Sequence, residues 1–371
     1  MTSIEKIRVL VADDSAFMRK VLISILDSDG SFEVVGEARD GREAVEKSAK
    51  LKPHVITMDI NMPHMDGLQA TEIIMSTEPR PILIVSSESK EGAKPTLRAL
   101  ALGAIDFLAK PTSAIDLDMS SVRDELVRKL RTASKVRVVR NLLRSEPARI
   151  ARVEWAPLEL ASALAEHGTA LHGAGLPVAV LAASTGGPAT LMTLLPQFAA
   201  GFPGAVLVVQ HMPGAFTSQF AEQLASVSHL PVKQAENGEI LRAGQVYVCP
   251  GDSHLRVVPP GRVVLDSGPR IAGYRPSIDV TLESVAALAG ANASVAILTG
   301  MGNDGARGVI AIQQNGGLVL AQDESTSVIF GMPAEAIKTG AVQHVLPLQQ
   351  IAAAIFRRVA GHPGSTRAAA L

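Results

Sequence analysis

Short apolar runs alternate with amphipathic stretches through the first part of the chain. The stretches at 17–26 and 43–51 repeat apolar residues every three to four positions, which is the period of a helix with one buried face. The apolar runs are continuous, as in strands that are buried on both faces of a parallel sheet. This succession predicts a flavodoxin-like α/β domain at residues 1–131 with five parallel strands. The predicted strands are 7–12, 32–35, 55–58, 82–85 and 105–108.

The same alternation resumes after Pro177. It predicts a second domain, residues 177–371, that is doubly wound α/β with a mostly parallel sheet. Residues 244–265 differ, because turn-forming residues break their short apolar runs, and they predict an added β-hairpin. Between the domains, at 132–176, the periodicity fades while proline and glycine accumulate, which predicts a flexible linker. The strands predicted in the second domain are 178–183, 205–210, 295–299, 318–321 and 342–345.

Charge narrows the range of partners. The net charge of the 371-residue chain is −1, which argues against a nucleic acid as the main partner, since binding to a phosphate backbone needs clustered cations. The exception is the segment from Arg123 to Arg152, where ten residues are basic and three are acidic. We interpret this basic segment as a solvated helix face leading into the linker. Contact with an acidic partner protein is the alternative.

Several features predict a cytoplasmic location. The single cysteine, Cys249, rules out an internal disulfide and fits a reducing compartment, and it has no basic neighbour in sequence that would make it a nucleophile. Residues 1–8 lack the apolar core of a secretory signal. Residues 167–221 contain no Asp, Glu, Lys or Arg, but prolines at 177, 188, 196 and 203 interrupt them, so we expect no membrane insertion.

Polar residues follow the predicted strands of the first domain at one edge of the sheet. Asp13 and Asp14 come after the first strand, Asp59 after the third, Ser86 after the fourth and Lys110 after the fifth. Three carboxylates in one pocket repel one another unless a cation joins them, and oxygen ligands favour Mg²⁺. With the metal bound, the Asp59 carboxylate can attack a phosphoryl group. Lys110 and Ser86 can hold the new oxygens.

This half resembles the receiver domains of response regulators over nearly its full length. The resemblance implies that Asp59 is the phosphoacceptor and that a histidine kinase is the phosphodonor. It also implies that Ser86 and Phe107 are switch residues and that Lys110 precedes a cis proline, Pro111. The implied metal ligands are Asp13, Asp14, Asp59 and the backbone carbonyl of Asn61.

Three chemically active side chains follow strands of the second domain. Ser184 ends the run 178–183, His211 ends the run 205–210, and Asp304 follows the run 295–299. A serine hydroxyl needs a base to take its proton, and the base needs a group that orients it. These three residues can fill the roles of nucleophile, base and orienting carboxylate. The turn at Gly186 and Gly187 predicts backbone N–H groups at a helix start, where an oxyanion would be stabilised.

The pattern G-x-G-x-x-G at Gly300, Gly302 and Gly305 opens an alternative. Between a predicted strand and a helix, with Asp323 about 20 residues further on, it is typical of dinucleotide binding. Asp304 argues against this interpretation, because its carboxylate would lie in the loop that must cradle a pyrophosphate.

Residues 178–360 resemble the catalytic domain of the chemotaxis protein-glutamate methylesterases, and the whole chain resembles that receiver-plus-esterase family. The resemblance implies a triad of Ser184, His211 and Asp304, with Thr185, Gly186, Gly187 and Met301 lining the site and no cofactor there. The implied reactions are hydrolysis of glutamate γ-methyl esters on methyl-accepting chemoreceptors, with release of methanol, and deamidation of receptor glutamines. The receiver is implied to inhibit the esterase until Asp59 is phosphorylated. The motifs lie at 183–187, 210–213, 274–280, 298–305 and 321–333.

Three other functions would each need particular features of the sequence. A response regulator that binds DNA would need a recognition helix and a basic surface after Pro177, and neither is evident. A non-catalytic adaptor would not need the three active side chains. An esterase that acts on proteins of another signalling system would carry the same residues, so the sequence leaves that alternative open.

Overall fold

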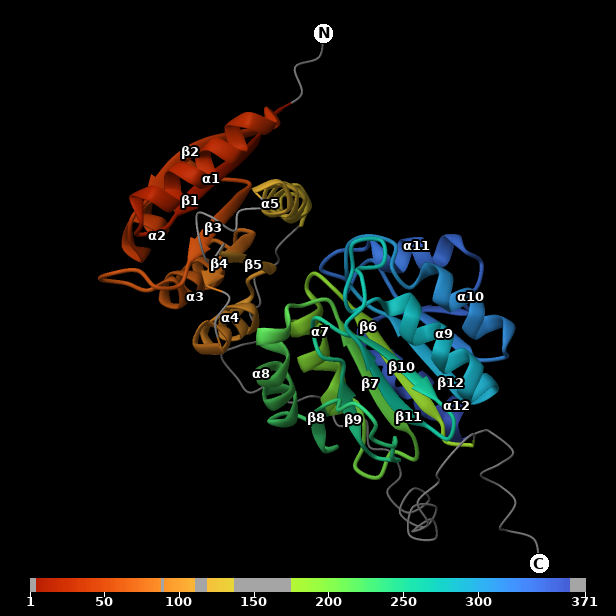
Figure 1. The fold of residues 1–371 in the computed structure, drawn as a ribbon. Helices are drawn as coiled ribbons and strands as arrows, with labels where there is room; N and C mark the ends of the chain where they lie inside the picture. The colour runs from red at the N-terminus through yellow and green to blue at the C-terminus, as the bar shows by residue number, and fades with distance from the viewer. Residues whose placement is uncertain (1–4, 88–89, 111–118, 137–174, 361–371) are drawn as a thin grey trace, which may run out of the picture. The chain divides into compact units, whose positions relative to one another are not determined.

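The chain divides into two compact units, residues 1–150 and 151–371, in the computed structural model. The structure describes residues 5–87, 90–110, 119–136 and 175–360 (Figure 1). Pro111, most of the predicted linker at 132–176 and the basic residues after Lys135 lie outside the described residues. The two units are described separately below.

The first unit is an α/β domain with five parallel strands in the order β2–β1–β3–β4–β5, which confirms the predicted fold. Helices α1 and α5 contact each other, as do α2 with α3 and α3 with α4, so both faces of the sheet are covered. The strands are β1 (Ile7–Ala12), β2 (Phe32–Ala38), β3 (Val55–Asp59), β4 (Ile82–Ser87) and β5 (Asp106–Lys110). The helices are α1 (Ala16–Asp29), α2 (Gly41–Leu51), α3 (Gly67–Thr77), α4 (Lys90–Leu102) and α5 (Met119–Ala133).

Side-chain caps determine where three of these helices begin. The Ser15, Asp40 and Asp66 side chains each accept a hydrogen bond from a backbone N–H group in the first turn of α1, α2 and α3. Each cap satisfies a donor that has no partner within its own helix. The caps start the helices just beyond the carboxyl ends of the strands, where the polar residues of the acidic site lie.

The predicted basic segment begins on α5, and two of its cations are paired within the first unit. Lys129 lies 3.2 Å from Asp106 and 3.2 Å from Glu125, and Arg131 lies 2.7 Å from Asp29. These ion pairs hold α5 against the sheet and against α1. This part of the segment is therefore engaged with the receiver-like unit itself.

The second unit has seven parallel strands in the order β14–β13–β12–β6–β7–β9–β8, and a two-stranded antiparallel hairpin, β10–β11, packs on it. Helices α9, α10 and α11 and the hairpin cover one face, while α7, α8 and α12 cover the other (Figure 1). The strands are β6 (Val178–Ala183), β7 (Ala205–Gln210), β8 (Val232–Gln234), β9 (Val246–Val248), β10 (His254–Val258), β11 (Arg262–Asp266), β12 (Ala293–Ile297), β13 (Leu318–Gln322) and β14 (His344–Leu346). The helices are α7 (Gly187–Leu194), α8 (Gly214–Ala225), α9 (Ile278–Ala289), α10 (Ala306–Gln314), α11 (Met332–Lys338) and α12 (Leu348–Ala360).

The hairpin prediction for residues 244–265 is only partly right. The hairpin consists of β10 and β11, whereas β9 joins the main sheet and pairs in parallel with β7 and β8. Strand β8 was not predicted at all. It has three residues, two of them polar, so it carries no apolar run that could distinguish it from a loop.

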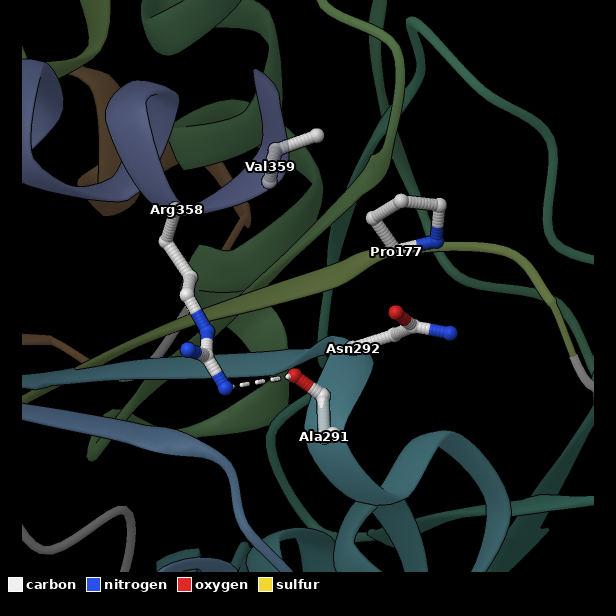
Figure 2. Close-up of a pocket in the computed structure, with 5 residues that line it drawn as sticks. All are labelled: Pro177, Ala291, Asn292, Arg358 and Val359. Atoms are coloured by element: carbon white, nitrogen blue, oxygen red, sulfur yellow. Dashed lines mark hydrogen bonds between the residues drawn. The ribbon is translucent and has the colours of Figure 1, made fainter. Parts of the chain in front are cut away.

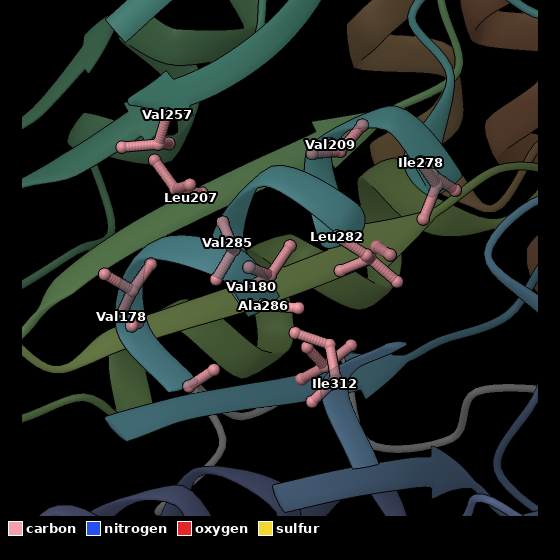
Figure 3. Packing of buried hydrophobic residues seen from close by; sticks show 14 of the residues in the cluster. Val178, Val180, Leu207, Val209, Val257, Ile278, Leu282, Val285, Ala286 and Ile312 are labelled. Atoms are coloured by element: carbon pink, nitrogen blue, oxygen red, sulfur yellow. The ribbon is translucent and has the colours of Figure 1, made fainter. Parts of the chain in front are cut away.

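Helix α9 packs across the centre of the sheet. Leu282, Val285 and Ala286 face Val178 and Val180 of β6 in Figure 3, and all are almost completely inaccessible to solvent. Burying one such valine or leucine contributes about 1.5–3 kcal/mol. This packing holds the start of α9 at the carboxyl end of β6, beside the predicted active-site residues.

No helix among the described residues is both long enough and apolar enough to cross a membrane.

Candidate active site

The predicted catalytic residues meet at the carboxyl ends of three neighbouring strands, β7, β6 and β12. Strand order reverses around β6, because β7 continues the sheet on one side and β12 on the other. Ligand sites of open α/β sheets lie at such reversals. Ser184 follows β6 and His211 follows β7, while Asp304 lies in the loop between β12 and α10.

Strand pairing brings Ser184 and His211 together. Ala183 pairs with Gln210, so the next residue on each strand is Ser184 and His211, respectively. The N–H of His211 donates to the carbonyl of Ala183 at 3.1 Å. Neighbouring strands lie about 4.8 Å apart, so the two side chains start from adjacent points of the backbone.

The His211 ring is oriented by Asp304. Its Nε2 lies 2.9 Å from Asp304 Oδ2, whereas its Nδ1 is buried and has no hydrogen-bond partner among the described residues. A carboxylate can only accept, so Nε2 carries the proton and Nδ1 is left with a lone pair. Nδ1 is therefore the nitrogen that is available to act as a base.

Asp304 is buried and held at the start of helix α9. Its carboxylate accepts hydrogen bonds from the N–H groups of Ile278 at 2.7 Å and Asp279 at 3.0 Å, and from Ser277 Oγ at 3.0 Å. Burial acts to raise the pKa of Asp304, but His211 and these backbone N–H groups outweigh it and hold the pKa below its ordinary value. Asp304 is thus kept ionised, as an orienting carboxylate must be.

Tyr274 covers the other side of the imidazole. The rings of Tyr274 and His211 are stacked, with centroids 4.4 Å apart and an interplanar angle of 16°. Gly302 lets the tyrosine approach closely, since a Cβ at that position would lie 2.2 Å from the Tyr274 hydroxyl. Together, Tyr274 and Asp304 leave the His211 ring little freedom to rotate.

The turn after Ser184 needs glycine at two positions. Gly186 has φ +78°, and a Cβ there would lie 2.5 Å from Val328 Cβ. A Cβ on Gly187 would lie 1.9 Å from Gln210 Oε1. The Gly187 N–H does not match the prediction of an exposed donor, because it donates to the Ser184 carbonyl at 2.8 Å and so closes the turn.

Gln210 is a buried residue that the sequence reasoning left without a role. Its side-chain Nε2 donates to the carbonyls of both Ser184, at 2.9 Å, and His211, at 3.0 Å. The only signal in the sequence is a polar residue at the end of an otherwise apolar strand. The side chain ties the two strand ends together just where nucleophile and base emerge.

The loop between β12 and α10 lies against the serine. A Cβ on Gly300 would come within 2.9 Å of Ser184 Cβ, and Met301 is the next residue of this loop. Thr185 is buried, and its carbonyl accepts a hydrogen bond from Thr299 Oγ1 at 3.0 Å. Thr299 thus links the serine turn to the end of β12.

The first unit brings the predicted acidic residues together. Ligand atoms of Asp13, Asp14 and Asp59 all lie within 4.8 Å of one another. Lys110 Nζ lies 2.8 Å from Asp13 Oδ2 and 2.9 Å from Asp59 Oδ1. Burial raises the pKa of Asp59, and Lys110 offsets this only in part. A cluster of carboxylate oxygens of this kind fits a hard divalent cation such as Mg²⁺.

Ser86 and Phe107 are both buried, Ser86 near the carboxyl end of β4 and Phe107 as the second residue of β5. The Phe107 ring lies under Lys129, with Nζ 5.2 Å from the ring centroid. The predicted switch residues are therefore packed into the domain rather than exposed on its surface.

Comparisons with known proteins match both units. A family model described as "CheB methylesterase" matches residues 179–355, and one described as "Response regulator receiver domain" matches residues 9–120. The protein named "Protein-glutamate methylesterase/protein-glutamine glutaminase" of Pyrococcus abyssi is 44% identical over 95% of this chain and 94% of its own length. The protein of the same name from Symbiobacterium thermophilum is 46% identical over 95% of this chain and 97% of its own.

The chain belongs to the protein-glutamate methylesterase/protein-glutamine glutaminase family. A solved structure, the CheB methylesterase catalytic domain of Thermotoga maritima, is 40% identical and covers 49% of this chain and 98% of its own, with a TM-score of 0.48. The family models and the two relatives confirm the family resemblance predicted from the sequence.

The structure does not favour dinucleotide binding at the pattern formed by Gly300, Gly302 and Gly305. The N–H groups of Gly305 and Gly308, at the start of α10, both donate to the Asp279 carboxylate, at 3.0 and 2.7 Å. A pyrophosphate at this helix start would need those donors.

Cys249 is also excluded as a nucleophile, because it is buried and burial raises the pKa of its thiol well above the ordinary value.

A small hollow at the opposite end of the sheet has a structural role. It is lined by Pro177, Ala291, Asn292, Arg358 and Val359, next to the amino ends of β6 and β12 (Figure 2). Arg358 donates from Nη2 to the carbonyls of Ala291, at 3.2 Å, and Gly316, at 2.6 Å. The arginine ties α12 to the loops at this end and contributes nothing to the serine site.

Proposed function

We propose that this chain hydrolyses glutamate γ-methyl esters on chemoreceptors, releasing methanol, and deamidates receptor glutamines, with Ser184, His211 and Asp304 as the triad. The observation that carries the assignment is the bond of 2.9 Å between His211 Nε2 and Asp304, which leaves the other ring nitrogen without a partner among the described residues. Family membership supports the substrate class, since the relatives carry both activities in their names.

The reaction starts when Ser184 Oγ attacks the γ-carbonyl carbon and His211 Nδ1 takes the hydroxyl proton. The imidazolium that results is stabilised by the ionised Asp304 at Nε2. His211 then returns the proton to the leaving group, methanol from an ester or ammonia from an amide. Water, activated by the same nitrogen, attacks the acyl-serine and releases glutamate.

The oxyanion of each tetrahedral intermediate needs N–H donors near Ser184. Because the Gly187 N–H closes the turn, the proposal assigns this role to the N–H of Gly186, with Thr185 and Met301 lining the same space. One preorganised donor of this kind contributes about 2.7–4 kcal/mol to transition-state stabilisation.

In the receiver unit, Asp59 is proposed to accept a phosphoryl group from a chemotaxis histidine kinase. Asp13, Asp14, Asp59 and the Asn61 carbonyl would hold Mg²⁺, which neutralises charge during phosphoryl transfer. Lys110 is placed to hold a phosphoryl oxygen, since its Nζ already lies 2.9 Å from Asp59 Oδ1. Ser86 and Phe107 would then respond to the new charge.

The test of the triad is methanol release from a methylated receptor. We expect Ser184→Ala and His211→Ala each to lower turnover by about 10³-fold or more, because the serine is a poor nucleophile without its base. Ser226→Ala, an exposed serine on the same domain, is the matched control and should keep full activity. Wild-type turnover in either triad variant would refute the assignment. Hydrolysis of a small ester, without activity on the receptor, would instead indicate that the substrate is a different protein.

A further inference from the structure

Two carboxylates are exchanged between the starts of helices α9 and α10. Asp304 lies just before α10 but accepts the N–H groups of Ile278 and Asp279, which open α9. Asp279, in the first turn of α9, accepts the N–H groups of Gly305 and Gly308, at the start of α10. Each helix is therefore capped by a carboxylate from the other helix.

Neither helix caps itself with its own side chain. The N-cap residue of α10 is Gly305, which has no side chain, and Ser277 at the N-cap of α9 makes no cap bond. The Ser277 hydroxyl donates to Asp304 instead. An N-terminal cap contributes about 0.5–2 kcal/mol to stability. The exchanged carboxylates provide these caps and, in doing so, bind the two helix starts to each other.

Two glycines permit the close approach that the exchange needs. A Cβ at Gly308 would lie 2.5 Å from Leu282 Cβ, and a Cβ at Gly305 would lie 3.0 Å from Ile278 Cγ2. Helix α9 is packed on the sheet through its buried leucine and valine side chains. These contacts therefore fix the position of α10, and of the loop that carries Asp304, relative to α9.

The charges around Asp279 show that its carboxylate is held there at a cost. Burial raises the pKa of Asp279, and the charge of Asp304 adds to the effect, while the N–H groups of Gly308 and Gly305 offset it in part. Arg307, the nearest cation among the described residues, is 3.9 Å away and pairs more closely with Glu283, at 2.7 Å. A half-buried acid beside another acid is unfavourable for stability alone.

We propose that Asp279 is a positioning residue for catalysis: by holding the N–H groups of Gly305 and Gly308, it fixes the loop that presents Asp304 to His211. The inference rests on the proposed role of the triad. Asp279 touches neither substrate nor His211, and it acts only through the backbone on which Asp304 is carried. Its loss lets Asp304 move relative to the imidazole while the rest of the site stays in place.

The experiment compares Asp279→Ala with Asp279→Asn in the full-length chain. The alanine variant loses both bonds to α10, and we expect kcat for methanol release to fall about 10- to 100-fold with KM nearly unchanged, since small misplacements of a catalytic group have effects of this size. Both bonds are accepted by one carboxylate oxygen, Oδ1, which an asparagine retains. The asparagine variant should therefore stay within about threefold of wild type.

A spectroscopic readout separates positioning from loss of stability. The ring proton that His211 shares with Asp304 gives a downfield NMR signal, which should move upfield in Asp279→Ala and stay in place in Asp279→Asn. Thermal unfolding of each variant shows the fraction folded at the assay temperature. Glu283→Gln, one turn along α9 and also beside Arg307, is the control for charge loss and should keep its activity and its signal.

Parallel assays of Asp304→Asn and Ser184→Ala distinguish failure of the positioning role of Asp279 from failure of the proposed triad. If those two are inactive while Asp279→Ala has wild-type kcat and an unmoved His211 signal, the positioning role is wrong and the triad stands. If those two remain active, the triad itself is wrong. A fall in kcat that is equal in the alanine and asparagine variants also overturns the inference, because it assigns the effect to the charge and not to the bonds.

Discussion

Gln210 shows how one side chain can serve two catalytic residues. Its amide donates to the carbonyls of Ser184 and His211, while its Oε1 is buried without a hydrogen-bond partner among the described residues. An unpaired buried oxygen costs about 1–3 kcal/mol. The stability of the domain would not require such a group, whereas the proposed mechanism would, because it needs Ser184 and His211 to be aligned.

Replacing Gln210 with leucine should separate activity from stability. We expect kcat for methanol release to fall about 10- to 100-fold, because the two strand ends lose their shared tie. The melting temperature should change much less, since the substitution also removes the unpaired oxygen. Gln313→Leu, at an exposed position on α10, is the control. A melting temperature that falls in step with kcat would show that Gln210 only stabilises the fold.

For single residues, the sequence reveals the candidate catalytic side chains better than the side chains that hold them in place. Ser184, His211 and Asp304 could be singled out because their side chains have few other reasons to follow apolar strands. Gln210, Ser277 and Tyr274 escaped notice as individuals, since an amide, a hydroxyl and a ring that hold other groups in place resemble ordinary polar or core residues. Their roles depend on contacts between segments that the sequence does not bring together.

Among helices and strands, the long apolar runs and the short strand β14 match the predictions, whereas the short strands β8 and β9 do not. The five strands of the first unit and β6, β7, β12 and β13 of the second overlap the predicted runs, because strands buried on both faces need continuous apolar residues. Strand β9 was assigned to a hairpin, although its partners lie earlier in the chain: Val246 pairs with Val232, 14 positions before it, and with Val206, 40 positions before it. Such pairing leaves no local signal.

The substitution Gly308→Ala tests how closely helices α9 and α10 pack. Alanine normally stabilises a helix interior by about 0.5–1 kcal/mol relative to glycine. Here its Cβ would lie 2.5 Å from Leu282 Cβ, so we expect the opposite, a loss of about 1–3 kcal/mol in the free energy of unfolding. Urea denaturation measures it. A more stable variant would show that the two helices do not pack this tightly.

On the scale of the whole molecule, the two candidate sites lie in different compact units. The described residues of the acidic site fall within 5–110, and those of the proposed serine site within 184–331. The sequence could predict both, because each is formed at the carboxyl ends of one parallel sheet. The link between them falls largely outside the described residues, where no periodic pattern exists from which a structure could be predicted.

Removing the receiver should reveal the inhibition of the esterase that the family resemblance implies. We expect a chain without residues 1–131 to release methanol about tenfold faster than the unphosphorylated full chain, equivalent to ~1.4 kcal/mol of inhibitory contact. Complete switching, from 1:99 to 99:1, would need about 5.5 kcal/mol, so graded activation is the natural outcome. In the full chain, Asp59→Asn should abolish activation by a small phosphodonor. If the truncated enzyme is no faster, the receiver does not inhibit.

The ring nitrogen that His211 leaves for Ser184 has a consequence for how such enzymes can diverge. Nδ1 is bonded directly to Cγ, the ring carbon that is attached to Cβ. The proposed base therefore has a short reach and depends on the register of β6 with β7. Changes in surface segments that leave this register intact should not disturb the proposed proton transfer. A slip of one residue between those two strands would silence the enzyme at once.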